Sequence, residues 1–356
     1  MIKPSKLLVA LALLALNGCQ DAPKNTLETS TEPASPDYTR VEFETILSDE
    51  ISIRAIDADN SKILYAGTGG KYGHIDKLTQ RVERGTLYLD TIPLHFRMAQ
   101  RNRGESFVMS IETPAMLYRI NDDGIQPVYT EAGDGVFYDA LQFYDDGQHA
   151  LAFGDPVDGC FSVLRSFDAG ATWIKVDCAS LPDFLSNEAG FAASNSSIAT
   201  SGNRGIIVTG GGASRALITD DYGLTWRDVI LPIKQGGGMT GAYALDFVGE
   251  TAVVVGGDWD NKGDNNMSMA ISKDSGNTWS SIRGDDTPGY RSDVSILSDN
   301  GQEILAVGSP GMDYSKDGGK SWKHLTNEPF YAFVMVSDST GYAAGRDRVD
   351  FFTLTE

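Results

Sequence analysis

The sequence Ser166-Phe167-Asp168-Ala169-Gly170-Ala171-Thr172-Trp173 is the first of four copies of one pattern in this chain of 356 residues. In each copy a hydroxyl residue is followed two positions later by Asp, four positions later by Gly, and then by Thr or Ser directly before Trp. The other copies span residues 219–226, 272–279 and 315–322, so their Trp residues lie 53, 53 and 43 residues apart. Repeats of this length are typical of propeller blades or of another repeat array.

Each part of the pattern suits a tight hairpin. The Asp can accept hydrogen bonds from backbone N–H groups of its own turn, and the Gly supplies the positive φ that the turn requires. The hydroxyl groups can join the two strand ends, while the Trp begins the returning strand and packs between neighbouring sheets. This pattern is the Asp-box, or BNR repeat, of β-propellers, and it lies on the outer hairpins of their blades. It therefore indicates a fold and not a catalytic site.

An apolar strand that ends in Gly precedes each box, and the same strand recurs elsewhere without a box. The copies with a box are 150–154, 206–210, 252–256 and 304–308, and the degenerate copies are 63–67, 106–109 and 341–345. The count predicts an all-β, seven-bladed propeller over residues 39–356, with about 45 residues per blade. The last blade lacks room for its own last strand. We therefore expect the alternating segment 41–46 to complete it, so that N- and C-terminal strands close the ring within one blade.

Residues 1–18 are expected to be a bacterial lipoprotein signal peptide. Two lysines precede the apolar run 7–16, which is too short to span a bilayer as a helix. The following Leu16-Asn17-Gly18-Cys19 resembles a lipoprotein cleavage site, at which Cys19 receives the lipid. The alternative is ordinary secretory cleavage, with Cys19 incidental.

Residues 19–38 predict a flexible tether, because polar residues and proline dominate and cannot form a core. Gln20 stands where an Asp would retain a lipoprotein in the inner membrane of enteric-type bacteria. We therefore expect the protein to be exported and anchored by its lipid to the outer membrane, at the periplasmic face.

The charge of the chain argues against nucleic acid as a partner. Its 29 basic and 49 acidic side chains give a formal net charge of -20. Phosphate backbones and anionic lipid surfaces repel such a chain. We expect no nucleic-acid binding, contact with a membrane only through the N-terminal lipid, and a monomer.

The two remaining cysteines, Cys160 and Cys178, flank the first box. If Ser166 faces Thr172 across the hairpin, the two cysteines face each other on adjacent antiparallel strands, within disulfide range. An exported protein permits oxidation, so we expect a structural disulfide. Two free thiols are the alternative.

Beyond the boxes, the chain resembles the photosystem II stability/assembly factor-like family of BNR propellers. The resemblance covers most of residues 50–350. Photosynthetic members bind nascent photosystem subunits as assembly scaffolds, which implies a binding function. This chain differs from them by its acidity and its lipoprotein signal. The segments that carry the resemblance are Ser52-Ile53-Arg54-Ala55-Ile56, Phe137-Tyr138-Asp139-Ala140, Ala152-Phe153-Gly154-Asp155-Pro156-Val157-Asp158-Gly159, Asn187-Glu188-Ala189-Gly190-Phe191-Ala192-Ala193-Ser194-Asn195, and Tyr290-Arg291-Ser292-Asp293 with Val307-Gly308.

Polar residues on the innermost strands are the candidate site, because these strands line the central channel of a propeller. One hypothesis is a sialidase-like exo-glycosidase, in which arginines hold the substrate carboxylate and a Glu-activated Tyr is the nucleophile. In the alternative, the charges neutralise one another in a water-filled tunnel. The candidate catalytic residues are Glu188, Asp139 and Tyr290, and the candidate binding residues are Arg54, Arg97, Asp139, Glu188, Asn195 and Arg291.

No motif predicts a cofactor or a metal site. The four histidines are scattered, and no glycine-rich dinucleotide fingerprint follows a strand. The sequence therefore favours a non-catalytic binding or assembly scaffold for an envelope protein, peptide or glycan. The sialidase-like glycosidase is the second hypothesis.

Overall fold

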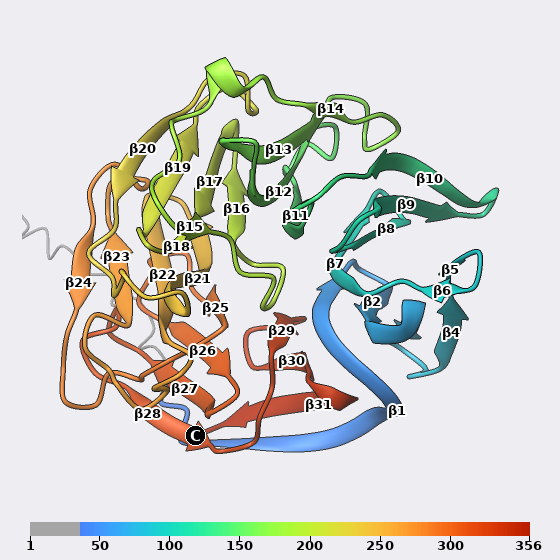
Figure 1. Ribbon diagram of the computed structural model, residues 1–356. Helices are drawn as coiled ribbons and strands as arrows, with labels where there is room; N and C mark the ends of the chain where they lie inside the picture. The colour runs from blue at the N-terminus through green and yellow to red at the C-terminus, as the bar shows by residue number, and fades with distance from the viewer. Residues whose placement is uncertain (1–35) are drawn as a thin grey trace, which may run out of the picture. The chain divides into compact units, whose positions relative to one another are not determined.

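The computed structural model describes residues 36–356 (Figure 1). The expected signal peptide, the lipidation of Cys19 and most of the tether lie outside these residues. The described part is built of strands, with the short 3-10 helices η1 (Thr68–Gly70) and η2 (Cys178–Ser180) and no α-helix. Within it, no helix is long and apolar enough to cross a membrane.

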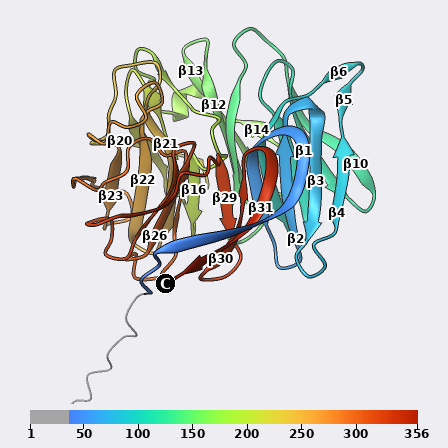
Figure 2. The ribbon, with the colours of Figure 1, turned by 90° about the horizontal axis from the view of Figure 1, so that it is seen from below.

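One long strand, β1 (Arg40–Ala58), joins the two ends of the described chain (Figure 2). Its first half pairs with β31 (Arg346–Thr355), from Arg40 opposite Thr355 onward, and its second half pairs with β2 (Lys62–Gly67). The expected pairing of N- and C-terminal strands is therefore confirmed. The sheet continues on one side with β30 (Thr340–Ala344) and β29 (Ala332–Met335), and on the other with β3 (Lys71–Asp76) and β4 (Val82–Thr86).

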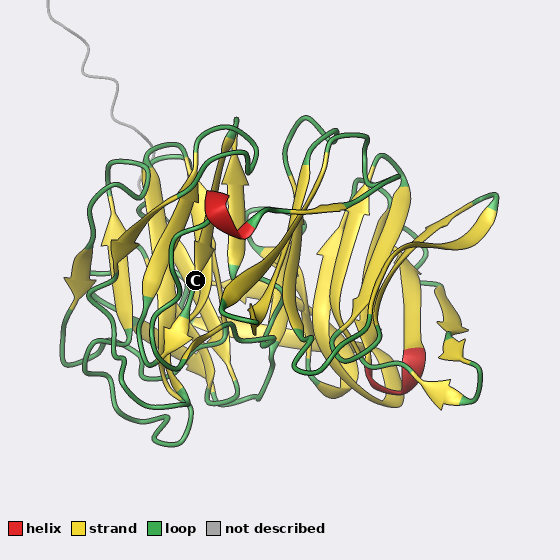
Figure 3. Ribbon diagram, turned by 45° about the horizontal axis from the view of Figure 1, so that its top comes forward, coloured by secondary structure: helices red, strands yellow, loops and turns green. Residues whose placement is uncertain are grey.

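Sets of four antiparallel strands make up the rest of the described chain. Strands and the loops between them dominate the ribbon (Figure 3). The second strand of each set is buried at almost every position, because neighbouring sheets cover both of its faces. In chain order the sets are β7 (Phe96–Asn102), β8 (Glu105–Ser110), β9 (Ala115–Asn121) and β10 (Gly124–Glu131); β11 (Tyr138–Phe143), β12 (Ala150–Val157), β13 (Cys160–Ser166) and β14 (Ile174–Lys175); β16 (Ile198–Ser201), β17 (Arg204–Val208), β19 (Arg215–Thr219) and β20 (Arg227–Ile230); β21 (Thr240–Val248), β22 (Thr251–Asp258), β23 (Met269–Ser272) and β24 (Ser280–Ile282); and β25 (Asp293–Ile296), β26 (Ile304–Gly308), β27 (Gly311–Ser315) and β28 (Lys323–Thr326). The short strands β15 (Glu188–Ala189) and β18 (Gly210–Gly211) extend the sheet of β21, and β5 (Tyr88–Leu89) and β6 (Ile92–Pro93) form a separate hairpin.

The first strands of successive sets contact one another around a common centre (Figure 1). Strand β1 contacts β7, β7 contacts β11, and the contacts continue through β16, β21, β25 and β29 back to β1. The core lies between neighbouring sheets. For example, the Phe107 ring of β8 lies 4.8 Å from the Phe143 ring of β11, and Trp173 meets Phe143 edge-on at 6.2 Å.

The four repeated hairpins use the same hydrogen bonds. In the first, Asp168 accepts the backbone N–H of Thr172 at 2.9 Å and the hydroxyls of Ser166 and Thr172 at 2.9 and 2.6 Å. The indole Nε1 of Trp173 donates to the Gly170 carbonyl at 3.1 Å. Gly170 has a φ of 84°, and a Cβ there would lie 2.6 Å from the Phe107 ring, so no other residue fits. The carboxylates that repeat these bonds are Asp221, Asp274 and Asp317.

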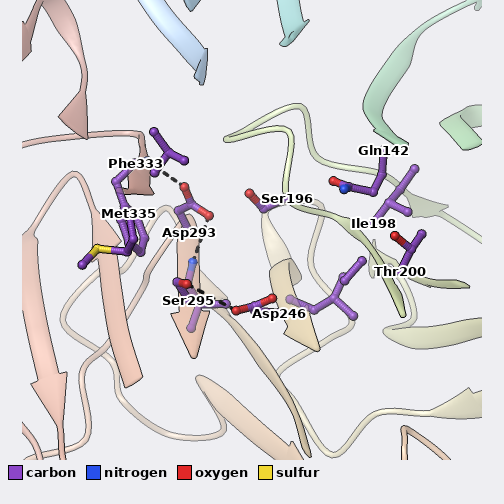
Figure 4. Close-up of a pocket in the computed structure, with 13 residues that line it drawn as sticks. Gln142, Ser196, Ile198, Thr200, Asp246, Asp293, Ser295, Phe333 and Met335 are labelled. Atoms are coloured by element: carbon purple, nitrogen blue, oxygen red, sulfur yellow. Dashed lines mark hydrogen bonds between the residues drawn. The ribbon is translucent and has the colours of Figure 1, made fainter. Parts of the chain in front are cut away.

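Polar side chains on or just before the innermost strands join five pairs of neighbouring sets. A carboxylate or amide oxygen on one strand accepts a backbone N–H of the neighbouring first strand. We call these contacts latches; Asp246 and Asp293 make two of them beside a polar central cavity of about 290 Å³ (Figure 4). The latches run from Asp57 to Arg101 N (2.5 Å), Gln100 to Phe143 N (3.4 Å), Asn195 to Leu141 N (2.8 Å), Asp246 to Ile296 N (2.7 Å) and Asp293 to Phe333 N (2.8 Å).

The expected disulfide between Cys160 and Cys178 is present, with a Cα–Cα distance of 5.7 Å. The register used to predict it was wrong by one residue, since Leu164 lies opposite Lys175. Cys178 also lies in η2 and not on a strand, because β14 is only two residues long.

Residues 36–38, which the sequence assigns to the tether, contact the described body. The Pro36 carbonyl accepts the Tyr314 hydroxyl at 2.8 Å, and Asp37 pairs with Lys316 and Lys323 at 3.0 and 2.6 Å. Tyr38 is buried. The folded body therefore begins before residue 39.

The latch carboxyls predict how stability depends on pH. Burial raises the pKa of Asp57 to about 6 and that of Asp293 to about 7, so the folded protein holds protons that the unfolded chain releases above pH 4. Stability from these groups is therefore complete at low pH and is lost as pH rises through 6 to 7. Hydrogen bonds from Thr278 lower the pKa of Asp274. The stability that such box carboxylates contribute has the opposite pH dependence: it is present near neutral pH and is lost in stronger acid.

We expect the free energy of unfolding, measured by urea titration, to fall between pH 5 and pH 8. In Asp293→Asn that fall should be smaller by on the order of 3 kcal/mol, because the titrating group is gone. The exposed Asp122→Asn is the control and should match the wild type. Equal pH profiles for Asp293→Asn and the wild type would contradict this account.

Candidate functional site

Four innermost strands carry one extra residue at the same position. Where β1 pairs with β2, Ile53 lies opposite Gly67 and Ala55 opposite Ala66, which leaves Arg54 unpaired in a β-bulge. Such a bulge turns its side chain out of the regular alternation of the strand. The residues in the corresponding bulges of β7, β11 and β21 are Arg97, Asp139 and Tyr243.

Three of these bulge residues meet in one cavity of about 160 Å³, which we call the arginine pocket. Its walls are aromatic. The Phe191 ring stacks on Tyr243 with the centroids 3.9 Å apart, and Tyr290 meets Tyr243 edge-on at 4.8 Å. The lining residues are Arg54, Arg97, Phe191, Ala192, Ala193, Met239, Tyr243, Trp259 and Tyr290.

The two guanidinium groups of the pocket are half-buried and are held by neutral groups. Arg54 lies over the Tyr331 ring at 4.2 Å, and Arg97 donates to the Ala192 carbonyl at 3.2 Å. Burial, and then the charge of Arg54, lower the pKa of Arg97. Among residues 36–356, no carboxylate lies within salt-bridge distance of either guanidinium. An anion beside these groups would relieve their mutual repulsion.

Asp139 lies nearby, but neither of its buried carboxyl oxygens has a hydrogen-bond partner among the described residues. Its side chain is 1% exposed, and a Cβ on Gly190 would lie 2.2 Å from its Oδ2 atom. Burial, and then the neighbouring Asp155 carboxylate, raise the pKa of Asp139 well above its usual value. Burial therefore disfavours the charged form of Asp139, and no salt bridge joins it to Arg54 or Arg97 within the described chain.

Such a pocket can hold one carboxylate that carries an apolar group. Guanidinium groups donate paired hydrogen bonds to a carboxylate, and a site sheltered from water strengthens them. The flat faces of Phe191, Tyr243 and Trp259 suit apolar or planar groups. Trp259 is 40% exposed, and the Lys262 ammonium lies over its ring at 4.2 Å.

Solved structures show which fold carries this pocket. YCF48 bound to D1 peptide matches 91% of this chain and 99% of its own chain, with a TM-score of 0.63 and 14% sequence identity.

The fold is a β-propeller. Two further solved structures match with a TM-score of 0.60. YCF48 from Cyanidioschyzon merolae shares 15% identity over 88% of this chain and 99% of its own, and U3-55K shares 13% over 88% and 98%. No protein-family model matches the sequence, and no curated protein does. At these identities the likeness extends to the fold and no further.

Two of the predicted site residues, Glu188 and Arg291, form buried ion pairs instead of lining the arginine pocket. Glu188 lies on β15, away from the first strand of its set, because the loop before β16 carries it outward. Its carboxylate binds Arg215 at 2.6 and 2.9 Å and the Thr209 hydroxyl at 2.5 Å. Arg291 likewise forms a buried ion pair with Asp313. Neither residue is among those that line the arginine pocket with Arg54 and Arg97.

The remaining candidates are divided. Tyr290 lies in the arginine pocket, whereas Asn195 is a latch that also donates to the carbonyls of Ala99 and Leu141, at 3.1 and 3.2 Å. Among the described residues, no hydrogen bond joins Glu188 to Tyr290. Burial raises the pKa of Tyr290, which is opposite to what an activated nucleophile needs. The arrangement does not favour the glycosidase hypothesis.

Of the aromatic residues that line the pocket, the sequence interpretation identified Tyr290 and missed the others. Phe191, Tyr243 and Tyr331 have no pattern of their own, and only the bulge register connects Tyr243 with the arginines. Trp259 carried a signal, since it is the one Trp of five that lies outside the boxes.

The acidic loop around Trp259 is held by a lysine. The ammonium of Lys234 pairs with Asp258 at 3.3 Å and also with Asp264. In the part of the chain that the structure describes, no group of three or more His, Cys, Asp or Glu residues could hold a metal ion.

We expect Glu188 to act on stability. Glu188→Gln leaves Arg215 buried with one partner fewer and should lower the free energy of unfolding by about 3 kcal/mol. Urea denaturation at pH 7 measures this, with the exposed Glu250→Gln as the control. An unchanged unfolding midpoint in Glu188→Gln would show that the ion pair does not stabilise the fold.

Proposed function

We propose that this chain is a seven-bladed, Asp-box β-propeller that acts without catalysis as a binding scaffold for a peptide segment of an envelope protein. Cys19 carries the lipid, residues after it form the tether, and a monomeric propeller faces the periplasm from the outer membrane. One observation carries the proposal: between its aromatic walls the arginine pocket presents two half-buried guanidinium groups, which have no carboxylate partner among the described residues.

The count of seven blades is supported by the strand sets. Five sets of four strands lie between β7 and β28. The long sheet through β1 divides into two more, because one half of β1 pairs with β31 and the other with β2. The contacts between first strands run through all seven sets and return to β1.

The charge distribution supports a ligand with a single carboxylate. The chain as a whole carries a formal net charge of -20, which repels polyanions at long range. The pocket offers two adjacent positive charges and apolar surface, which match one carboxylate on an apolar residue. The YCF48 structure with a D1 peptide shows that this fold can bind a peptide.

We expect the full propeller to bind octapeptides with a free C-terminal carboxylate more tightly than the same peptides as amides. An array of such peptides identifies a binder, and fluorescence anisotropy then measures its affinity. Arg54→Gln and Arg97→Gln should each weaken binding of the free acid by about tenfold or more, because each removes a charged hydrogen-bond donor.

Arg103→Gln is the matched control, since Arg103 lies exposed on a turn and bonds only the Asp146 carbonyl. Circular dichroism confirms that each variant is folded. Equal binding of acid and amide, or full affinity in both pocket variants, would refute the proposed site.

The anchoring part of the proposal has a separate test. In cells given a labelled fatty acid, the wild-type protein should carry the label and sediment with the outer membrane. Cys19→Ser should lose both properties, because the acylated sulfur is gone. A label that persists in Cys19→Ser would contradict lipidation at this residue.

A further inference from the structure

An apolar hollow of about 330 Å³ lies beside the hairpin of β5 and β6, and we call it the hairpin groove. Leu89, Ile92 and Pro93 line it from the hairpin, and Glu112 and Pro114 line it from the segment between β8 and β9. The arginine pocket does not include these residues, and the proposed function does not use them.

The hairpin exposes large apolar side chains. Ile92 is 64% exposed and Tyr88 is 56% exposed. Only two residue pairs join β5 and β6, and such a short hairpin is not stable on its own.

Backbone contacts at the base hold the hairpin in place. Leu87 N donates to the Gly70 carbonyl at 2.9 Å, Gly70 N donates to the Leu94 carbonyl, and the Leu94 side chain is buried. Each contact joins the hairpin to the segment after β2. The chain therefore fixes an apolar tip in water, which is typical of a binding surface.

The hairpin groove is next to the arginine pocket. His95, directly before β7, lines the groove, and Arg97 lines the pocket two residues later in the chain, a separation of about 7 Å along extended backbone. Glu112 at the groove wall is close enough to Arg97 to favour its charged form. A short extended ligand that starts at the arginines therefore reaches the groove within two or three residues.

We propose that the hairpin groove is a second subsite for the same peptide and takes an aromatic or branched aliphatic side chain close to the C-terminal carboxylate. This inference rests on the proposed function. Charge complementarity selects the occupant. The arginines attract the carboxylate, whereas Glu112 repels a second acidic residue. The apolar surface of Ile92 and Leu89 is therefore left to an uncharged side chain.

The test uses the full propeller and a C-terminal peptide array in which the last four positions are varied over all residues, each as free acid and as amide. The wild type should retain free acids with Phe, Leu, Ile or Val enriched at one of the positions before the last residue. Ile92→Ser should remove this enrichment and weaken the best peptide by about tenfold, because the apolar contact is lost.

The same variant should leave the affinity for that peptide with Ala at the enriched position unchanged. Leu78→Ser is the matched control, because Leu78 is 93% exposed and lines neither the groove nor the pocket. Arg97→Gln should weaken both peptides alike.

The outcomes separate the two proposals. Free acids retained without apolar enrichment, or enrichment that survives Ile92→Ser, overturn the groove and leave the arginine pocket standing. A wild type that retains no free acid in preference to its amide overturns the proposed function, and the groove with it.

Discussion

The propeller depends on hydrogen bonds that no single sheet can make for itself. The first strand of each set has a free edge that faces the centre, and its backbone N–H groups there need acceptors. Side chains of the neighbouring first strand provide them, as Asp57 does for Arg101 and Asp293 for Phe333. Burying a carboxyl for this purpose is costly, and the raised pKa values of these groups reflect that cost. These hydrogen bonds fix the position of one sheet relative to the next, which apolar packing alone does not specify.

The arginine pocket depends on that fixed register. Arg54, Arg97 and Tyr243 come from different sheets, and their side chains meet because each lies in the same bulge of its own first strand. A change in the angle between two sheets would separate the guanidinium groups. The latches that hold the sheets together thus also determine the spacing of the charges at the proposed site.

Much of the fold could be predicted because it repeats. The four boxes and the Gly-ended strands before them indicate the sheets. The lone strand at the N-terminal end and the incomplete blade at the C-terminal end indicate how the ring closes. The site was only partly predictable. Arg54 and Arg97 lie on the first strands of their sets and were found, whereas Glu188 was misplaced because a long loop precedes the true first strand of its set, β16. Phe191 and Trp259 belong to loops whose course depends on tertiary packing, and Asp57 and Asp293 look in sequence like ordinary strand residues.

The long strand β1 has a consequence for the order of folding. Its second half can pair with β2 as soon as that strand has been made, but its first half has no partner until Arg346–Thr355 has left the ribosome. Until then one side of the earliest strand is an open edge, able to pair with any other extended chain. Pairing of β1 with β31 therefore cannot precede synthesis of the last described strand, and it joins residues that are almost the whole described chain apart. A truncated product that lacks β31 would retain that open edge and be prone to aggregation.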